Sequence, residues 1–242
     1  MIDRALLARC VAPYEVEITD ALYARLDTYA RLLAEWNEKM NLTAITDPTG
    51  IAVKHFADSL SVAPLLPQGE FSMIDVGTGA GFPGVPLALL REDCKLTLLD
   101  SLNKRLTFLD AVCRELGLAV SLVHARAEEG GRNPALRECF DVATARAVAA
   151  LPTLCEYCLP FVKVGGRFIA LKGPDAAREQ DAAQKAVALL GGKVTAATTL
   201  ILPSAPEEGV EPMERRLIEI AKAAHTPPKF PRPSAKIAKQ PL

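Results

Sequence analysis

The chain has 242 residues, of which 50% are hydrophobic, and its formal net charge at pH 7 is −1. This much apolar material supplies one good-sized core with an appendage, or at most two small domains. A nearly neutral balance excludes a protein that is basic throughout, so any binding to a nucleic acid would depend on a local cluster of cations.

The six cysteines mostly lie in apolar or helix-like contexts, which predicts free thiols in a reducing compartment. Cys155 and Cys158 form a CxxC pair, but only Cys139 lies near enough to add a ligand, so we expect no metal site. The first residues lack the pattern of a secretion signal, and no apolar run approaches the roughly 18 residues of a membrane span. We therefore expect a cytoplasmic protein without a membrane partner.

The first sixty residues are predicted to be helical. Apolar residues recur at three- and four-residue spacing over 22–40, which is typical of an amphipathic helix. A second helix is expected to start at Asp47, with Pro48 at its first position, and to end before Pro64. We interpret residues 1–66 as an N-terminal helical extension.

From Phe71 onward, short apolar runs alternate with helical stretches, which predicts an α/β domain with a doubly wound, mostly parallel, seven-stranded sheet over residues 67–222. Only the polar, proline-rich loop 203–212 joins the last two strands, which favours an antiparallel final pair. The predicted strands are 71–76, 96–99, 119–123, 140–144, 167–171, 193–201 and 214–221.

The strongest local signal is a glycine-rich turn after the first strand. Asp75 is followed by Gly77, Gly79 and Gly81, and a dinucleotide fingerprint would place its third glycine where Phe82 stands. Glycines let the chain turn sharply and let a ligand approach the backbone. The pattern suits S-adenosylmethionine better than a nicotinamide cofactor, although a tight structural turn has the same composition.

Polar residues follow the other predicted strands at the same edge of the sheet. Asp100, after the second strand, is placed to accept hydrogen bonds from both ribose hydroxyls of a nucleoside. Backbone groups at Ala127 and Glu128 are candidates for pairing with an adenine. Arg146 is a candidate for a phosphate or carboxylate, or for an ion pair with an acid such as Glu128, and Lys172 is a further crevice-facing cation.

The C-terminal segment 223–242 is basic, because no acid follows Glu219. Composition favours a solvated, loosely ordered tail. The functional alternative is an arm that binds RNA phosphates, with Phe230 stacked on an exposed base and the arm outside the cofactor crevice. On this alternative the phosphate contacts are Lys229, Arg232 and Lys236.

The sequence resembles the bacterial small-subunit ribosomal RNA guanine-N7 methyltransferases, the glucose-inhibited division protein B family. The resemblance runs from about residue 30 to the end. The matching stretches are Asn41-Leu42-Thr43, KHFADSL at 54–60, IDVGTGAGFPG at 74–84, LLDSLNKRLTFL at 98–109, ARAEE at 125–129, ARA at 145–147, ALKG at 170–173 and KFPR at 229–232. Family members often carry an aliphatic residue at the position of Phe82, and many carry a basic residue where Pro233-Ser234 stands.

The resemblance implies a Rossmann-like, class I methyltransferase that carries a methyl group from S-adenosylmethionine to guanine N7 in 16S ribosomal RNA, at position 527. The implied partner is that RNA, the small subunit or an assembly intermediate, with no obligate protein partner. Alternatives are a methyltransferase of another RNA or a small molecule, and a non-enzymatic assembly factor. The implied cofactor contacts are Gly77, Phe82, Asp100, Ala127, Glu128 and Arg146, to which the glycine turn adds Asp75 and Gly79.

Guanine N7 keeps its lone pair at neutral pH, so this reaction needs no general base. We therefore expect no catalytic histidine and a mechanism of positioning, with Arg146, Asn41 and Lys172 as candidate residues. His55 is expected to be a structural histidine of a helix.

Overall fold

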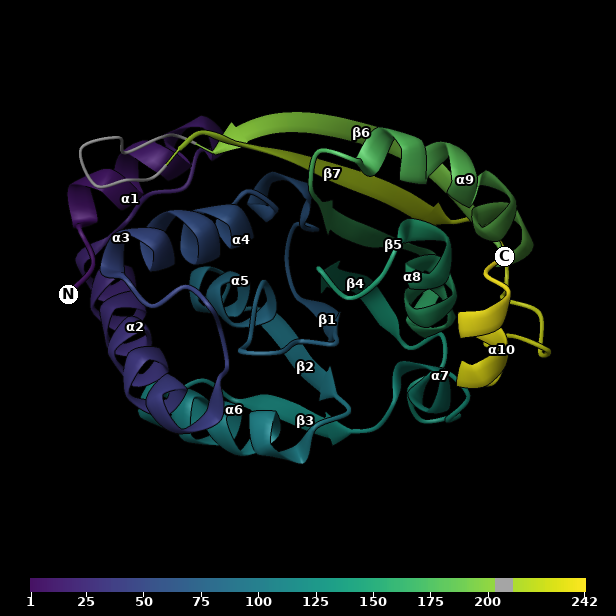
Figure 1. The fold of residues 1–242 in the computed structure, drawn as a ribbon, viewed down its shortest axis with the longest axis horizontal. Coiled ribbons are helices and arrows are strands. Elements are labelled where there is room, and N and C mark those ends of the chain that lie inside the picture. The colour runs from purple at the N-terminus through teal and green to yellow at the C-terminus, as the bar shows by residue number, and fades with distance from the viewer. Residues whose placement is uncertain (203–210) are drawn as a thin grey trace.

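A computed structural model describes residues 1–202 and 211–242. Its centre is a seven-stranded sheet in the order β3-β2-β1-β4-β5-β7-β6 (Figure 1). The first five strands run parallel, and β7 is antiparallel to both of its neighbours. The strands are β1 (Phe71–Val76), β2 (Cys94–Asp100), β3 (Val120–His124), β4 (Phe140–Arg146), β5 (Val162–Lys172), β6 (Gly192–Leu202) and β7 (Met213–Lys222).

The doubly wound α/β class, all seven strands and the antiparallel final pair are confirmed. β5 begins at Val162, five residues before its predicted start, because Val162 pairs with Phe140 before the register shifts to Val142 and Arg167. Most of the predicted loop 203–212 lies outside the described residues.

Helices cover both faces of the sheet, and each face has its own apolar core. Successive strand residues point to opposite faces, so Met73 joins one core and Ile74 the other. The first core is covered by α1 (Arg4–Val11), α2 (Asp20–Met40), α5 (Gly84–Leu90) and α6 (Asn103–Glu115). The second is covered by α8 (Leu151–Cys158) and α9 (Ala176–Leu189), and the short helices α7 (Ala127–Gly130) and α10 (Ser234–Lys239) lie on the same side.

The second predicted helix begins as expected, since the Asp47 side chain accepts a hydrogen bond from the Gly50 N–H and Pro48 follows it. It comprises α3 (Pro48–Gly50), a π-helical turn over Ile51–Ala57 and α4 (Asp58–Leu60), so it ends before Pro64. The wide turn brings its residues to the carboxyl end of β4, where they contact Arg146.

The C-terminal segment packs against the domain instead of extending loosely into solvent. Phe230 is 4% exposed and belongs to the second core, so the prediction that its ring stacks on an exposed base is wrong. Arg137 donates hydrogen bonds to the carbonyl groups of Thr226 and Phe230, and Arg132 donates to that of Pro231. Among the described residues, no helix combines the length and the apolar composition needed to cross a membrane.

Candidate active site

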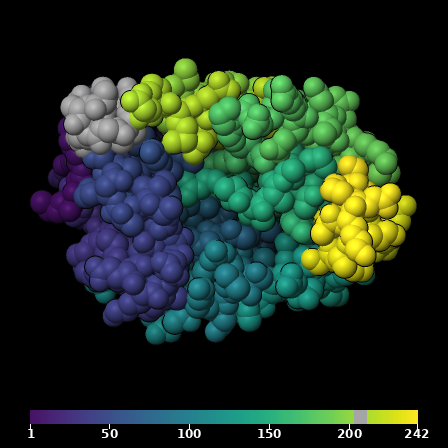
Figure 2. All heavy atoms as spheres, in the orientation of Figure 1, coloured from purple at the N-terminus to yellow at the C-terminus, as the bar shows by residue number. Residues whose placement is uncertain are grey.

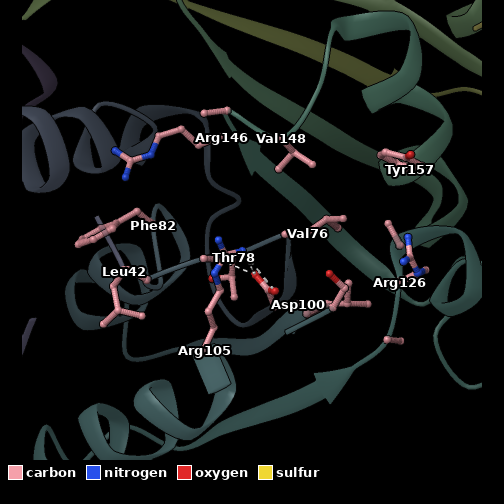
Figure 3. A pocket seen from close by; sticks show the side chains of 18 of the residues that line it. Leu42, Val76, Thr78, Phe82, Asp100, Arg105, Arg126, Arg146, Val148 and Tyr157 are labelled. Atoms are coloured by element: carbon pink, nitrogen blue, oxygen red, sulfur yellow. Dashed lines mark hydrogen bonds and ion pairs between the residues drawn. The ribbon is translucent and has the colours of Figure 1, made fainter. Parts of the chain in front are cut away.

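A pocket of about 480 Å³ opens at the carboxyl ends of β1, β2 and β4, a size typical of small-molecule sites. Figure 2 shows this face hollowed at its centre, between the N-terminal helices and the C-terminal segment. In Figure 3, Leu42, Phe82 and Arg146 gather at one end of the pocket, Arg126 and Tyr157 lie at the other, and Asp100 lies between them.

The glycine turn forms part of the pocket wall. Gly77 and Gly79 line it, and both have positive φ angles, of 68° and 61°. A Cβ atom on Gly77 would lie 2.8 Å from a methyl carbon of Val148. Glycine is therefore required at Gly77 both for the backbone conformation and for space.

Asp75 does not line the pocket, so its predicted contact with a cofactor is not supported by its position. Its carboxylate is fully buried and accepts hydrogen bonds from the Thr78 hydroxyl at 2.6 Å, the Gly84 N–H at 3.1 Å and the Thr144 hydroxyl at 3.0 Å. Burial raises the pKa of Asp75, and these donors oppose that shift. Through the contacts with Thr78 and Gly84, Asp75 stabilises the glycine turn from the protein interior.

Asp100 lines the middle of the pocket and also holds the turn in place. One carboxylate oxygen accepts the Gly79 N–H at 3.0 Å and the other accepts the Leu102 N–H at 2.9 Å. Arg105 lies 3.2 Å from the carboxylate. The same Arg105 nitrogen also lies 3.4 Å from the other oxygen, so four contacts surround the carboxylate. Because a carboxylate accepts about four hydrogen bonds, a ligand hydroxyl would take the place of Arg105 at Asp100.

Ala127 and Glu128 line the pocket at the end where Arg126 and Tyr157 lie, as predicted from the strand pattern. Two further residues of this end, Tyr157 and Ser234, were missed, because no motif marks them. Ser234 belongs to the C-terminal segment and its side chain hydrogen bonds to Tyr157. The expectation that this segment lies outside the crevice is therefore wrong.

Arg146 lines the end of the pocket where Leu42 and Phe82 lie, and its guanidinium is held by three groups of the helical segment 48–60. It donates to Asp58 Oδ2 at 2.9 Å, to the Lys54 carbonyl at 3.0 Å and to His55 Nδ1 at 3.1 Å. Asp58 is fully buried and also accepts a hydrogen bond from Arg215 at 3.1 Å. The ion pair thus exists, but its acid is Asp58 and not Glu128.

His55 is a buried helix histidine, as expected, and it is also part of the pocket wall. Its ring stacks on Phe82 with centroids 4.4 Å apart, and its Nε2 lies 2.9 Å from Thr43 Oγ1. Burial and the nearby Arg146 lower the pKa of His55 to about 3. Both His55 and Thr43 belong to motifs that carry the family resemblance, and these motifs were the sequence signal that could have placed them in the site.

The other candidate positioning residues lie away from the pocket. Asn41 is exposed and ends α2 in the left-handed conformation, with φ of 49°. Lys172 lines a neighbouring hollow, where its ammonium group pairs with Glu179 at 2.7 Å and donates to the Ala149 carbonyl at 2.8 Å. Their contacts are those of a helix cap and a structural ion pair.

Two cations of the C-terminal region are paired with acids, which corrects the picture of an uncompensated basic tail. Lys222 is 1% exposed and lies 3.0 Å from Glu138. Arg232 makes a two-pronged contact with the fully buried Glu156, with distances from 2.7 to 3.1 Å. This contact gives Arg232 a structural role.

The remaining tail cations lie on the surface. Lys229 and Lys236 are exposed and line a groove together with Lys185 of α9, a residue that the tail pattern did not reveal. Three ammonium groups on one groove create a local positive surface on a chain whose net charge is nearly zero.

The CxxC thiols lie in the core. Cys155 and Cys158 are fully buried on α8. Burial raises the pKa of Cys155 to about 12 and raises that of Cys158 well above its usual value. Within residues 1–202 and 211–242, no three side chains of His, Cys, Asp or Glu are grouped in a way that would hold a metal ion. These thiols therefore act as small apolar core groups.

Solved structures with this fold include methyltransferases. A precorrin-6Y C5,15-methyltransferase from Geobacter metallireducens matches with a TM-score of 0.52 and 16% identity, over 69% of this chain and 87% of that one. The TYW2 protein of M. jannaschii, solved in complex with AdoMet, matches with a TM-score of 0.55 and 12% identity, over 74% and 79%. At such low identity these likenesses establish the fold, that of class I methyltransferases.

Sequence relatives are much closer. A ribosomal RNA small subunit methyltransferase G from Acetivibrio thermocellus is 46% identical over 99% of this chain and 96% of its own length. One from Alkaliphilus metalliredigens is 50% identical over 93% of this chain and 92% of its own length. The family model for rRNA small subunit methyltransferase G matches residues 22–205. With this match and these relatives, the chain belongs to the rRNA small subunit methyltransferase G family.

Proposed function

We propose that this protein transfers a methyl group from S-adenosylmethionine to N7 of a guanine in small-subunit ribosomal RNA. The observation that carries the proposal is a pocket with a buried carboxylate, Asp100, at its centre and an apolar wall closed by an arginine, Arg146, at one end. Family membership narrows the acceptor to this RNA. Such a substrate would place the protein in the cytoplasm.

The pocket residues fit the cofactor. We assign Asp100 to the ribose, the backbone at Ala127 and Glu128 to the adenine, and the bare backbone of Gly77 and Gly79 to the methionine part, and all of these residues line the pocket. When bound, the cofactor supplies an activated methyl group on a positively charged sulfur. On this assignment Phe82 and Arg146, which close one end of the pocket, would face the group that is transferred (Figure 3).

The side chains at this end suit a reaction that needs no base. Guanine N7 attacks with its own lone pair, and the lowered pKa of His55 makes it a poor proton acceptor. Phe82, stacked between Tyr29 and His55 with centroid distances of 5.2 and 4.4 Å, forms a rigid apolar surface. These residues would hold the base in line with the methyl group and exclude water.

The exposed lysines supply the cations that an RNA substrate requires. Lys229 and Lys236 were predicted from the sequence to contact phosphates, and Lys185 extends the same groove. Arg232 was predicted with them, but its guanidinium is bound to Glu156. We therefore assign the phosphate contacts to the three lysines.

Incubation with radiolabelled S-adenosylmethionine and small-subunit RNA, as naked transcript and as subunit, tests the proposal. We expect label in the RNA and, after borohydride and aniline treatment, strand cleavage at a single guanine, because N7-methylguanine is labile to this chemistry. Label on another atom, or only in a small molecule, would favour the alternative of a methyltransferase with a different acceptor. Cofactor binding without any transfer would favour the assembly factor.

A further inference from the structure

Thr43 is held against the pocket by its backbone and its hydroxyl group. Its N–H donates to Asn37 Oδ1 at 2.8 Å, and its Oγ1 accepts the Ile45 N–H at 3.0 Å. The residue is half-buried and lines the same end of the pocket as His55, Phe82 and Arg146. Its side chain therefore has a defined position next to the site of the methyl acceptor.

Arg146 determines which nitrogen of His55 carries the proton. A guanidinium group has only hydrogen-bond donors, and its NH2 group lies 3.1 Å from His55 Nδ1. The ring also contacts the Lys54 backbone, to whose carbonyl Arg146 itself donates. Because a guanidinium cannot accept, we assign Nδ1 as the acceptor, and in a neutral ring the proton is then on Nε2. Since Nε2 lies 2.9 Å from Thr43 Oγ1, His55 donates to the threonine hydroxyl.

The hydroxyl of Thr43 thus accepts two hydrogen bonds, from Ile45 and from His55, and both of its lone pairs are used. What remains is its own proton. Within the part of the chain that the structure describes, no acceptor contacts this proton. The chain of contacts from Arg146 through His55 therefore leaves the hydroxyl proton of Thr43, a residue that lines the pocket, available to a ligand.

We infer that Thr43 is a specificity-determining residue that donates a hydrogen bond to O6 of the target guanine. This inference rests on the proposed function. Guanine presents N7 and O6 as adjacent acceptors, whereas adenine presents an amino group beside N7. With both lone pairs occupied, the hydroxyl accommodates the oxygen of guanine and opposes the amino group of adenine. His55 and Arg146 act through Thr43 as positioning residues.

Base analogues at the target nucleotide test the inference. Wild type, Thr43→Val and Thr43→Ser are compared on RNA with guanine or 2-aminopurine at that position, because 2-aminopurine keeps N7 and lacks O6. In Thr43→Val we expect the ratio of kcat/KM for guanine to that for 2-aminopurine to fall about tenfold, the value of one neutral hydrogen bond. Thr43→Ser should keep most of the wild-type ratio.

The ratio distinguishes the loss of a contact with O6 from general damage to the pocket, because general damage lowers kcat/KM for both RNAs together. If the ratio in Thr43→Val is unchanged while wild type methylates guanine N7, the inference about Thr43 is wrong and the proposed function stands. If wild type does not methylate guanine N7, the proposed function is wrong as well. A second readout needs no turnover. The ¹⁵N NMR spectrum of wild type at pH 7 should show His55 protonated on Nε2, and protonation on Nδ1 would contradict the inference.

Discussion

Two arginine–carboxylate pairs, one in the pocket and one at the C-terminal segment, are built alike and serve different ends. Asp58 and Glu156 are both fully buried, while the side chains of Arg146 and Arg232 are 16% and 11% exposed. Asp58 has a second arginine, Arg215, at 3.1 Å. Glu156 has only Arg232 as an ion-pair partner among the described residues.

The two arginines differ in whether they also line the pocket. Arg232 directs its Nε and NH2 groups at one acid and ties the C-terminal segment to α8. Arg146 uses its donors on three groups of the 48–60 helical segment and still lines the pocket. A buried ion pair therefore does not by itself mark a functional site; its position relative to a cavity does.

The largest effect is expected from Arg232→Ala. The substitution leaves the buried Glu156 carboxylate with the backbone N–H of residue 232 but without its ion-pair partner, which costs about 3–5 kcal/mol of unfolding free energy. Urea unfolding measures the loss. Lys239→Ala, at an exposed lysine of the same segment, is the control and should change stability little. Equal stability of the two variants would show that the Arg232 contact contributes nothing.

Arg146→Ala should act mainly on turnover. Removing the guanidinium frees His55 and Thr43 at the acceptor end, and misplacing the reacting groups by about 1 Å lowers the rate by about a hundredfold. The loss of stability should be smaller than in Arg232→Ala, because Asp58 keeps Arg215. Arg215→Ala is the matched control, since Arg215 shares Asp58 but does not line the pocket. Similar methylation rates in both variants would contradict this role.

The groove lysines should control the binding of RNA through salt. Replacing Lys185, Lys229 and Lys236 by glutamine should reduce the slope of log affinity against log salt by about two units, at about 0.7–0.9 per lost phosphate contact. Affinity for S-adenosylmethionine should stay within error. Binding titrations at several salt concentrations provide the measurement. If the slope does not change, the RNA-facing surface has to be sought elsewhere, for example around Lys54.

Asp100→Ala should weaken the binding of S-adenosylmethionine by roughly ten- to a hundredfold, or about 1–3 kcal/mol, through the loss of the ribose contacts. It should also lower stability, because the Gly79 N–H and Arg105 lose their acceptor. Calorimetric titration measures the affinity. Arg105→Ala keeps the carboxylate and should retain more affinity; the reverse order would argue against ribose binding by Asp100.

The two regions should also respond to acid in different ranges. His55 has a folded-state pKa of about 3 against 6.5 when unfolded, so its contribution to stability is complete above pH 6.5 and falls as the pH decreases toward 3. Glu138 lies 3.0 Å from Lys222. Burial acts to raise the pKa of Glu138, but its hydrogen-bond donors outweigh burial and lower the pKa to about 2. Its contribution is complete above pH 4.5 and falls only below that value.

His55→Gln should therefore flatten the loss of stability between pH 6.5 and 5, where the wild type is expected to lose up to about 1.4 kcal/mol per pH unit through this residue. Glu138→Gln should leave that range unchanged and affect only lower pH. Urea unfolding at pH 7, 6, 5 and 4 separates the two. A wild-type profile that His55→Gln does not alter would mean that the ring stays uncharged in both states.

The α/β class, the seven strands, the helix start at Asp47 and the glycine turn were all predictable from the amino-acid pattern, because they depend on periodicity and on residues with special backbone preferences. It also marked Asp100 and Ala127, since the carboxyl ends of parallel strands meet at one edge. These features are local in the chain.

Which of the charged residues line the pocket depends on how distant segments pack together. Asp75 points into the interior, where Thr78 of the glycine turn donates to it. Arg146 pairs with Asp58, 88 positions away in the chain, and Arg232 pairs with Glu156, 76 positions away. Ser234 reaches the pocket from the far end of the chain. No spacing rule reports such contacts, because burial and pairing of a charge depend on which distant segments pack around it.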